Sequence, residues 1–151
     1  MGMDKSERLL YFQLFNEIGI IAQLNRAELE SVLPSGISAP HFGVLNHLVR
    51  MGDGETPQQI ARAFQVPKNS MTNTLAGLEA RGLIKMVQNP NDKRSKQVLL
   101  TKRGQQFREQ AIKSVEPKFK TFAQAFPPES LAELVPKLAA IREYLDKRRA
   151  Q

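Results

Sequence analysis

The centre of the chain carries a succession of patterns that few folds can accommodate. A short helical segment opens at Thr56-Pro57, because a capping hydroxyl followed by proline suits the first turn of a helix. A second helical segment begins at Pro67 and ends at Gly82, since glycine tolerates the left-handed conformation of a helix terminus. Two β-rich runs, residues 83–88 and 96–101, flank a turn rich in Asn and Pro and predict a hairpin. Helix, tight turn, helix and hairpin is the order of a winged helix-turn-helix.

Long amphipathic segments lie on both sides of this centre. On the N-terminal side, apolar residues recur at helical spacing from Asp4 to about Val32. This stripe is wider than a lone surface helix needs, because it also includes Leu9, Phe12, Phe15 and Ile20. Surplus apolar surface of this kind indicates burial against a second chain.

Three further helices are expected. The first is capped by Ser38 and directs four apolar residues inward, namely Phe42, Leu45, Leu48 and Val49. After the hairpin, Pro117 should kink one long helix, whereas Pro136 either bends or starts the last one. The Lys147-Arg148-Arg149 run is expected to be a frayed, solvated end. The predicted fold is therefore mostly α with a small β-hairpin wing, a winged helix-turn-helix with long N- and C-terminal dimerisation helices.

The distribution of charge agrees with a division of the chain into two parts. Residues 38–103 carry ten Lys/Arg against four Asp/Glu, whereas residues 1–37 carry three against five. A basic centre between less basic flanks indicates a module that meets a polyanion, although a solvated basic surface would have the same composition. We expect residues 37–103 to form a DNA-binding domain and residues 1–36 and 104–151 to form a helical dimerisation region.

Composition also excludes several classes of protein. The 151 residues include no cysteine, which excludes disulfides, thiol catalysis, thiolate zinc sites and cysteine-based oxidant sensing and is compatible with the cytoplasm as the expected location. No membrane-spanning stretch or secretory signal is expected. Because no Gly-rich phosphate loop, nucleophile elbow, metal motif or paired carboxylate cluster occurs, we expect neither an enzyme nor a cofactor or metal site.

A helical wheel divides residues 67–81 into two faces. The inner face carries Met71, Leu75 and Leu78, and the opposite face carries Asn69, Asn73, Ala76, Gly77 and Ala80. Small residues let a helix backbone approach a partner closely, and amides can pair with base edges, as a helix in the major groove requires. An ordinary helix in a small α-bundle is the structural alternative.

The predicted hairpin tip supplies a second candidate contact. It places three cations, Lys93, Arg94 and Lys96, beside the carboxylate of Asp92. Arginine enters a narrow minor groove favourably because the negative potential is enhanced there, and Arg94 is the candidate for that insertion. Asp92 would hold the tip by capping its backbone or by pairing with Arg94. The alternative is a hairpin that is charged only to stay soluble.

In these segments the sequence resembles the MarR family of bacterial regulators (multiple antibiotic resistance regulators). The matching residues are Ile37-Ser38, His41-Phe42, Val44-Leu45, Val66 through Ile84, and Asp92 through Thr101. The last of these is close to the family's wing signature, an Asp-x-Arg followed by a strand that ends in Leu-Thr. The resemblance covers nearly the whole chain. It implies a homodimer whose terminal helices intertwine and which presents two winged lobes to a pseudo-palindromic operator in double-stranded DNA. Family members typically repress transcription and often release DNA when a small molecule binds between platform and lobe.

The resemblance also implies roles for individual residues. Residues 67–81 would be the recognition helix in the major groove, and residues 85–100 would be the wing at the minor groove. Positions that contact bases or phosphates correspond to Lys68, Asn69, Ser70 and Thr72. Asn73 stands where the family often has a base-reading arginine, so we expect a preference for adenine at that step. Ser38, at a helix N-terminus, is a candidate phosphate anchor.

An effector pocket bordered by the first, second and fifth helices would include Phe15, Phe42, His47 and Arg50, although each of these also suits a filled core. The two histidines, His41 and His47, fall on different helix faces and predict no metal site; His41 could instead approach a phosphate. A nonspecific nucleoid-type DNA binder and a winged-helix adaptor for proteins are the alternative functions. The amides at positions 69 and 73 argue against the adaptor.

Overall fold

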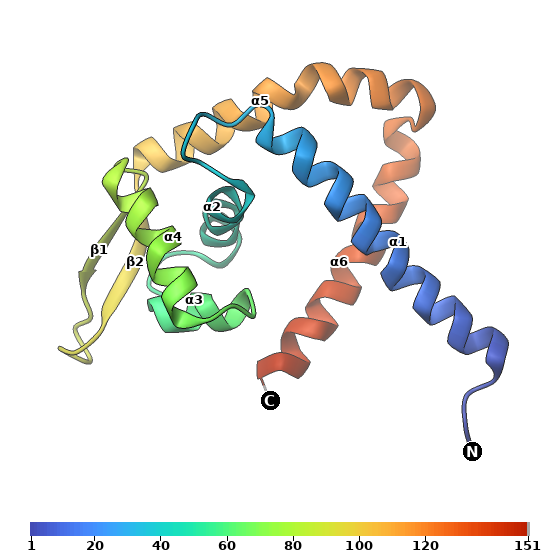
Figure 1. The fold of residues 1–151 in the computed structure, drawn as a ribbon, viewed down its shortest axis with the longest axis horizontal. Helices are drawn as coiled ribbons and strands as arrows, with labels where there is room; N and C mark the ends of the chain where they lie inside the picture. Colours follow the sequence, from blue (N-terminus) through green and yellow to red (C-terminus); the bar gives the residue numbers. More distant parts are fainter. Residues whose placement is uncertain (151) are drawn as a thin grey trace.

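The computed structural model describes residues 1–150, which form six helices and one two-stranded antiparallel sheet (Figure 1). In chain order the elements are α1 (Lys5–Glu30), α2 (Ala39–Met51), α3 (Pro57–Ala63), α4 (Lys68–Ala80), β1 (Ile84–Gln88), β2 (Lys96–Leu100), α5 (Lys102–Ala125) and α6 (Pro128–Ala150). Elements α2 to β2 pack into one lobe, whereas α1, α6 and the distal part of α5 extend away from it (Figure 1). The predicted fold class is confirmed. None of the helices within residues 1–150 has the length and apolarity that crossing a bilayer requires.

The hydrophobic core lies inside the lobe. Its largest fully buried side chains come from α2, α3, α4 and the hairpin, and they are Val44, Leu45, Leu48, Ile60, Leu75, Leu78, Ile84 and Val98. The residues predicted for the inner face of α4 are all buried. One inward prediction is wrong, because Val49 is 45% exposed. Val49 shares the buried face by spacing, but it lies near the end of α2, where it lines an open cleft.

Local sequence features explain where α3 begins, how the chain turns after it and where α4 ends. The Thr56 hydroxyl accepts a hydrogen bond from the Gln59 amide at 3.2 Å, and the Gln59 side chain accepts one from the Thr56 amide at 2.8 Å. The turn that follows α3 passes through Gln65, whose φ of 53° is in the left-handed region. Helix α4 ends at Ala80, and Gly82, two residues later, has a φ of 71°, the left-handed conformation that the sequence predicts there.

The hairpin is fastened to the lobe by the loop between α2 and α3. Its register pairs Ile84 with Leu100 and Gln88 with Lys96. On the other edge of β2, the Val98 amide donates to the Glu55 carbonyl at 2.8 Å, and the Leu100 amide donates to the Asp53 carboxylate at 2.9 Å. These two hydrogen bonds therefore attach the base of the wing to the loop between α2 and α3.

The long helices differ from the lobe in how little they bury. Among residues 1–150, α1 and α6 contribute no buried side chain, although both carry many large apolar residues. Helix α5 continues through Pro117 and changes direction along its length (Figure 1), and α6 begins at Pro128 and runs through Pro136. The expected C-terminal run is exposed to solvent, as predicted, but it is not frayed up to Ala150, because the last turn is helical and Arg149 donates to Asp146 at 3.2 Å.

Candidate nucleic-acid interface

Helix α4 exposes one polar face to solvent. The exposed residues include all five that the sequence singles out, namely Lys68, Asn69, Ser70, Thr72 and Asn73. The Thr72 hydroxyl donates to the Lys68 carbonyl at 2.9 Å and is therefore held against its own helix. Within residues 1–150 the amides of Asn69 and Asn73 have no hydrogen-bond partner, so their donors and acceptors are available to an external ligand.

Gly77 does not belong to this exposed face, and that part of the prediction is wrong. The residue is half-buried against the imidazole of His41, and a Cβ built on Gly77 would lie 3.0 Å from Nε2. A helical wheel places Gly77 opposite the core but takes no account of the N-terminus of α2, which crosses α4 at this point. The small residue permits close packing within the lobe.

The same histidine also forms hydrogen bonds with Ser38, the predicted phosphate anchor. Nδ1 of His41 accepts a hydrogen bond from the Ser38 amide at 3.0 Å and lies 2.8 Å from the Ser38 hydroxyl. Burial, together with the nearby positive charge of Arg81, lowers the pKa of His41 from its ordinary value. The Ser38 hydroxyl is therefore already engaged inside the protein, and His41 favours its neutral form.

The wing tip is held in the way that the sequence predicts. Oδ1 of Asp92 accepts from the Arg94 backbone amide at 3.0 Å and from Arg94 Nε at 3.4 Å, so Asp92 both caps the turn and pairs with the side chain. The Arg94 side chain is nevertheless 93% exposed. Lys93 and Lys96 are also exposed. The hairpin thus ends in an ordered, solvent-facing cationic tip.

A carboxylate that the sequence analysis missed connects the wing to α4. Glu79 accepts a hydrogen bond from the Met86 amide of β1 at 3.2 Å. Helix α4 and the hairpin consequently lie together at one end of the molecule (Figure 1). A lone glutamate on a helix carries no sequence signal for such a contact. The arrangement presents an amide-bearing helix and a cationic hairpin side by side.

Comparisons with known proteins agree with this geometry. A family model described as the MarR family matches residues 35–95, from the turn before α2 to the wing tip. A cysteine-to-serine mutant of MarR from E. coli is similar over 85% of this chain and 95% of its own, with 26% identity and a TM-score of 0.70. The central segment of the chain therefore matches the MarR family, and the chain as a whole is similar to MarR structures. It has the fold of the family's transcriptional regulators.

Two further MarR structures extend the likeness. The same E. coli mutant complexed with operator DNA is similar over 92% of this chain and 99% of its own, with 24% identity and a TM-score of 0.65. A MarR transcriptional regulator from Methanosarcina mazei Go1 is similar over 89% and 96%, with 19% identity and a TM-score of 0.74. No curated protein sequence matches the chain.

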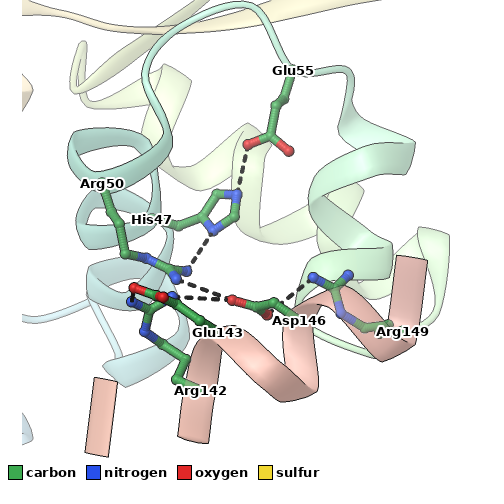
Figure 2. A network of polar contacts seen from close by, with 7 residues as sticks. All are labelled: His47, Arg50, Glu55, Arg142, Glu143, Asp146 and Arg149. Atoms are coloured by element: carbon green, nitrogen blue, oxygen red, sulfur yellow. Dashed lines mark hydrogen bonds and ion pairs between the residues drawn. The ribbon is translucent and has the colours of Figure 1, made fainter. Parts of the chain in front are cut away.

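The residues proposed for an effector pocket are separated in the structure. His47 and Arg50 line a cleft of about 440 Å³ that also includes residues of α5 and α6. Phe15 on α1 is exposed and Phe42 is buried in the lobe, and neither lines this cleft. Nε2 of His47 lies 2.7 Å from Glu55 Oε1 (Figure 2). Within residues 1–150 no cluster of His, Cys, Asp and Glu is suited to hold a metal ion.

Proposed function

We propose that this chain is a sequence-specific, DNA-binding transcriptional regulator of the MarR type that acts as a homodimer on a pseudo-palindromic operator. The observation that carries the proposal is the exposure of two unpartnered amides on α4, a helix hydrogen-bonded to the wing through Glu79, together with the exposure of Arg94 at the wing tip. Amides aimed outward from a helix suit base edges in the major groove, and an extended arginine suits the adjacent minor groove.

Contacts with DNA phosphate groups would position α4 and the wing on the duplex. Three exposed cations are candidates for these contacts: Lys68 at the start of α4, and Lys93 and Lys96 at the wing. Contacts of this kind fix the register of a protein on the duplex, whereas Asn69 and Asn73 would supply specificity. A MarR structure complexed with operator DNA has the same fold, which supports DNA as the partner of this surface.

The homodimer is supported by the apolar surface of the long helices. Exposed large apolar residues on α1 include Leu10, Phe12, Ile21 and Leu24, and those on α5 include Phe119, Phe122 and Phe126. Ile21 and the three phenylalanines also line an apolar cleft of about 1110 Å³ between α1, α5 and α6. A surface of this extent marks an interface, and helices from a second copy are its proposed occupant. Residues 1–36 and 104–151 would therefore form the platform and residues 37–103 the DNA-binding lobe.

Occupation of an operator by such a dimer would repress transcription by excluding other proteins from the site. A small-molecule effector would act where the lobe meets the long helices, since a change there alters the spacing of the two lobes. His47 and Arg50 face that junction.

The test is DNA binding by the purified full-length chain. Selection from a randomised duplex pool should enrich a pseudo-palindromic motif, and the affinity for that motif should fall steeply between about 50 and 200 mM salt, because counterions are released on binding. A duplex of the same length and base composition in scrambled order is the control. Equal affinity for both duplexes would indicate a nonspecific nucleoid-type protein, and no affinity for either would contradict the proposal.

A further inference from the structure

The wing is held to the rest of the lobe on both of its outer edges at the level of Met86 and Val98. These two residues face each other across the hairpin. The Val98 amide points out of one edge and donates to the Glu55 carbonyl at 2.8 Å. The Met86 amide points out of the other edge and donates to Oε2 of Glu79 at 3.2 Å. The loop before α3 therefore binds one side of the ribbon, and α4 binds the other.

Beyond this level the wing forms polar contacts only with itself. Within residues 1–150, the hydrogen bonds and the ion pair of residues 87–97 all join two members of that segment, as where the Asn89 amide donates to the Ser95 carbonyl at 3.2 Å. The tip projects beyond the lobe (Figure 1). Arg94 lies up to about 13 Å past Val98 at the rise of an extended strand, so a tilt of roughly 10° at that level would displace it by about 2 Å. A displacement of that size is enough to lose a binding contact.

Glu79 is the side chain through which α4 controls this tilt. It is the only Asp or Glu in α4, and it is exposed. Within residues 1–150 it forms no ion pair, and the hydrogen bond from Met86 is its one side-chain hydrogen bond. An unpaired carboxylate on a helix that meets DNA is electrostatically unfavourable, because it repels the phosphate groups. The charge and the hydrogen bond of Glu79 thus have opposite effects on DNA binding, and they can be separated by substitution.

We propose that Glu79 is a positioning residue for DNA recognition: its carboxylate fixes the direction of the wing relative to α4 and thereby the offset between Asn73 and Arg94. The two grooves of a half-site are contacted together only if this offset matches their spacing. A wing free to tilt would lose the contact of Arg94 and keep that of Asn73. The effect on DNA binding rests on the proposed function, whereas the control of the wing's direction does not.

The direction of the wing is measured first, in the chain without DNA. Because the sequence contains no cysteine, Gln58→Cys on α3 and Asn91→Cys at the wing tip accept one spin label each at exposed positions. Double electron–electron resonance, with labelled chain diluted into unlabelled chain, measures the distance between the two labels within one copy. Glu79→Ala should shift or broaden this distance distribution, whereas Glu79→Gln, which keeps an acceptor oxygen, should not. An unchanged distribution for Glu79→Ala would overturn the proposal.

A double-mutant cycle then tests the consequence for operator binding, measured by fluorescence anisotropy. Glu79→Ala should weaken binding about fivefold, although it removes a negative charge. Arg94→Ala should weaken binding about tenfold in the parent but only about twofold in the Glu79→Ala background, because a misdirected arginine contributes little. Asn73→Ala should weaken binding by the same factor in both backgrounds. A loss of stability alone would not couple Glu79 to Arg94 and leave Asn73 unaffected.

Two further variants separate the hydrogen bond from the charge. Glu79→Gln should bind the operator at least as tightly as the parent, because the acceptor remains and the repulsive charge is gone. Glu109→Ala removes an exposed carboxylate from α5 and should leave binding unchanged. Tighter binding by Glu79→Ala than by the parent would show that the charge dominates and would overturn the positioning role. If Glu79→Ala fails to fold, as judged by circular dichroism, Glu79→Met replaces it, because methionine has similar length and no strong acceptor.

The positioning role and the proposed function fail separately in these measurements. A parent chain that binds no duplex refutes the proposed function, and the distance between the spin labels still decides whether Glu79 directs the wing. A parent that binds its operator, with Arg94→Ala equally costly in both backgrounds, refutes only the positioning role.

Discussion

Gly77 of α4 lies directly against the imidazole of His41, such that a Cβ at position 77 would stand 3.0 Å from Nε2. The ring cannot retreat freely, because its Nδ1 accepts a hydrogen bond from the Ser38 amide. A Cβ at position 77 would therefore make a contact tighter than ordinary packing, and the His41 ring would have to shift by a few tenths of an ångström to accommodate it.

Substitution of Gly77 by alanine should reveal this contact. In the parent we expect Gly77→Ala to lower the free energy of unfolding, because the overlap with His41 outweighs the gain in helix propensity. In a His41→Ala background the same substitution should raise the free energy of unfolding by about 1 kcal/mol, the usual advantage of alanine over glycine in a helix. Urea denaturation of the four proteins measures both effects. The same effect of Gly77→Ala in both backgrounds would show that the contact is unimportant.

The environment of His41 predicts a pH dependence of stability. Burial and the charge of Arg81 lower its pKa in the folded protein, whereas the unfolded chain titrates near about 6.5. Between these two values the unfolded state binds more protons, so the free energy of unfolding rises with pH. This contribution is complete above the unfolded pKa and is lost as the pH falls through the folded pKa. Urea denaturation at pH 7.5 and 5.5 should show a smaller loss at low pH for His41→Gln than for the parent, and an equal loss would exclude His41 as the cause.

Removal of the exposed wing arginine should weaken DNA binding without affecting assembly. Arg94→Ala is expected to reduce operator affinity by about 1–3 kcal/mol, because it eliminates the minor-groove contact. Fluorescence anisotropy measures the affinity, and sedimentation velocity checks that the dimer persists. Arg26→Ala on α1 is the matched control for charge. An Arg94→Ala variant that binds as tightly as the parent would refute the role of the wing.

Asn73→Ala should change specificity more than general affinity for DNA. Selection from a randomised duplex pool should show relaxed preference at one base step in each half-site. Lys68→Ala, in contrast, should weaken binding to all sequences and reduce its salt dependence, since Lys68 is assigned to a phosphate. An unchanged motif for Asn73→Ala would remove this residue from base recognition.

A charge in the apolar surface of α1 should separate the dimer. Ile21 is 61% exposed and lines the cleft between α1, α5 and α6. Ile21→Glu is therefore expected to sediment as a monomer and to lose most operator affinity. Gln13→Glu introduces the same charge at an exposed polar position of the same helix and should remain a dimer. A dimeric Ile21→Glu protein would place the interface elsewhere.

The parts of the fold that the sequence predicts are those determined by local chemistry. The buried face of α4 follows from the helical spacing of Met71, Leu75 and Leu78, and the end of α4 follows from the conformational freedom of Gly82. The paired role of Asp92 at the wing tip is likewise local, because its partner Arg94 is two residues away.

The errors and omissions concern contacts between distant segments. A helical wheel places Gly77 on the exposed face, because periodicity within one helix cannot reveal that His41 of another helix packs against it. The contact of Arg108 with Asn46 and that of Arg50 with Asp146 join segments that only the tertiary fold brings together. Whether Pro136 starts or bends the last helix could not be predicted either, since the spacing of its apolar residues is the same in both cases.

Within residues 1–150, α1 and α6 contain no buried residue, and this exposure bears on how the stability of the protein depends on its concentration. In the proposed homodimer these helices would acquire most of their stability on association, so folding of these segments and association of two copies would form a single equilibrium. The melting temperature should therefore rise with protein concentration, whereas a self-sufficient monomer would melt at one temperature.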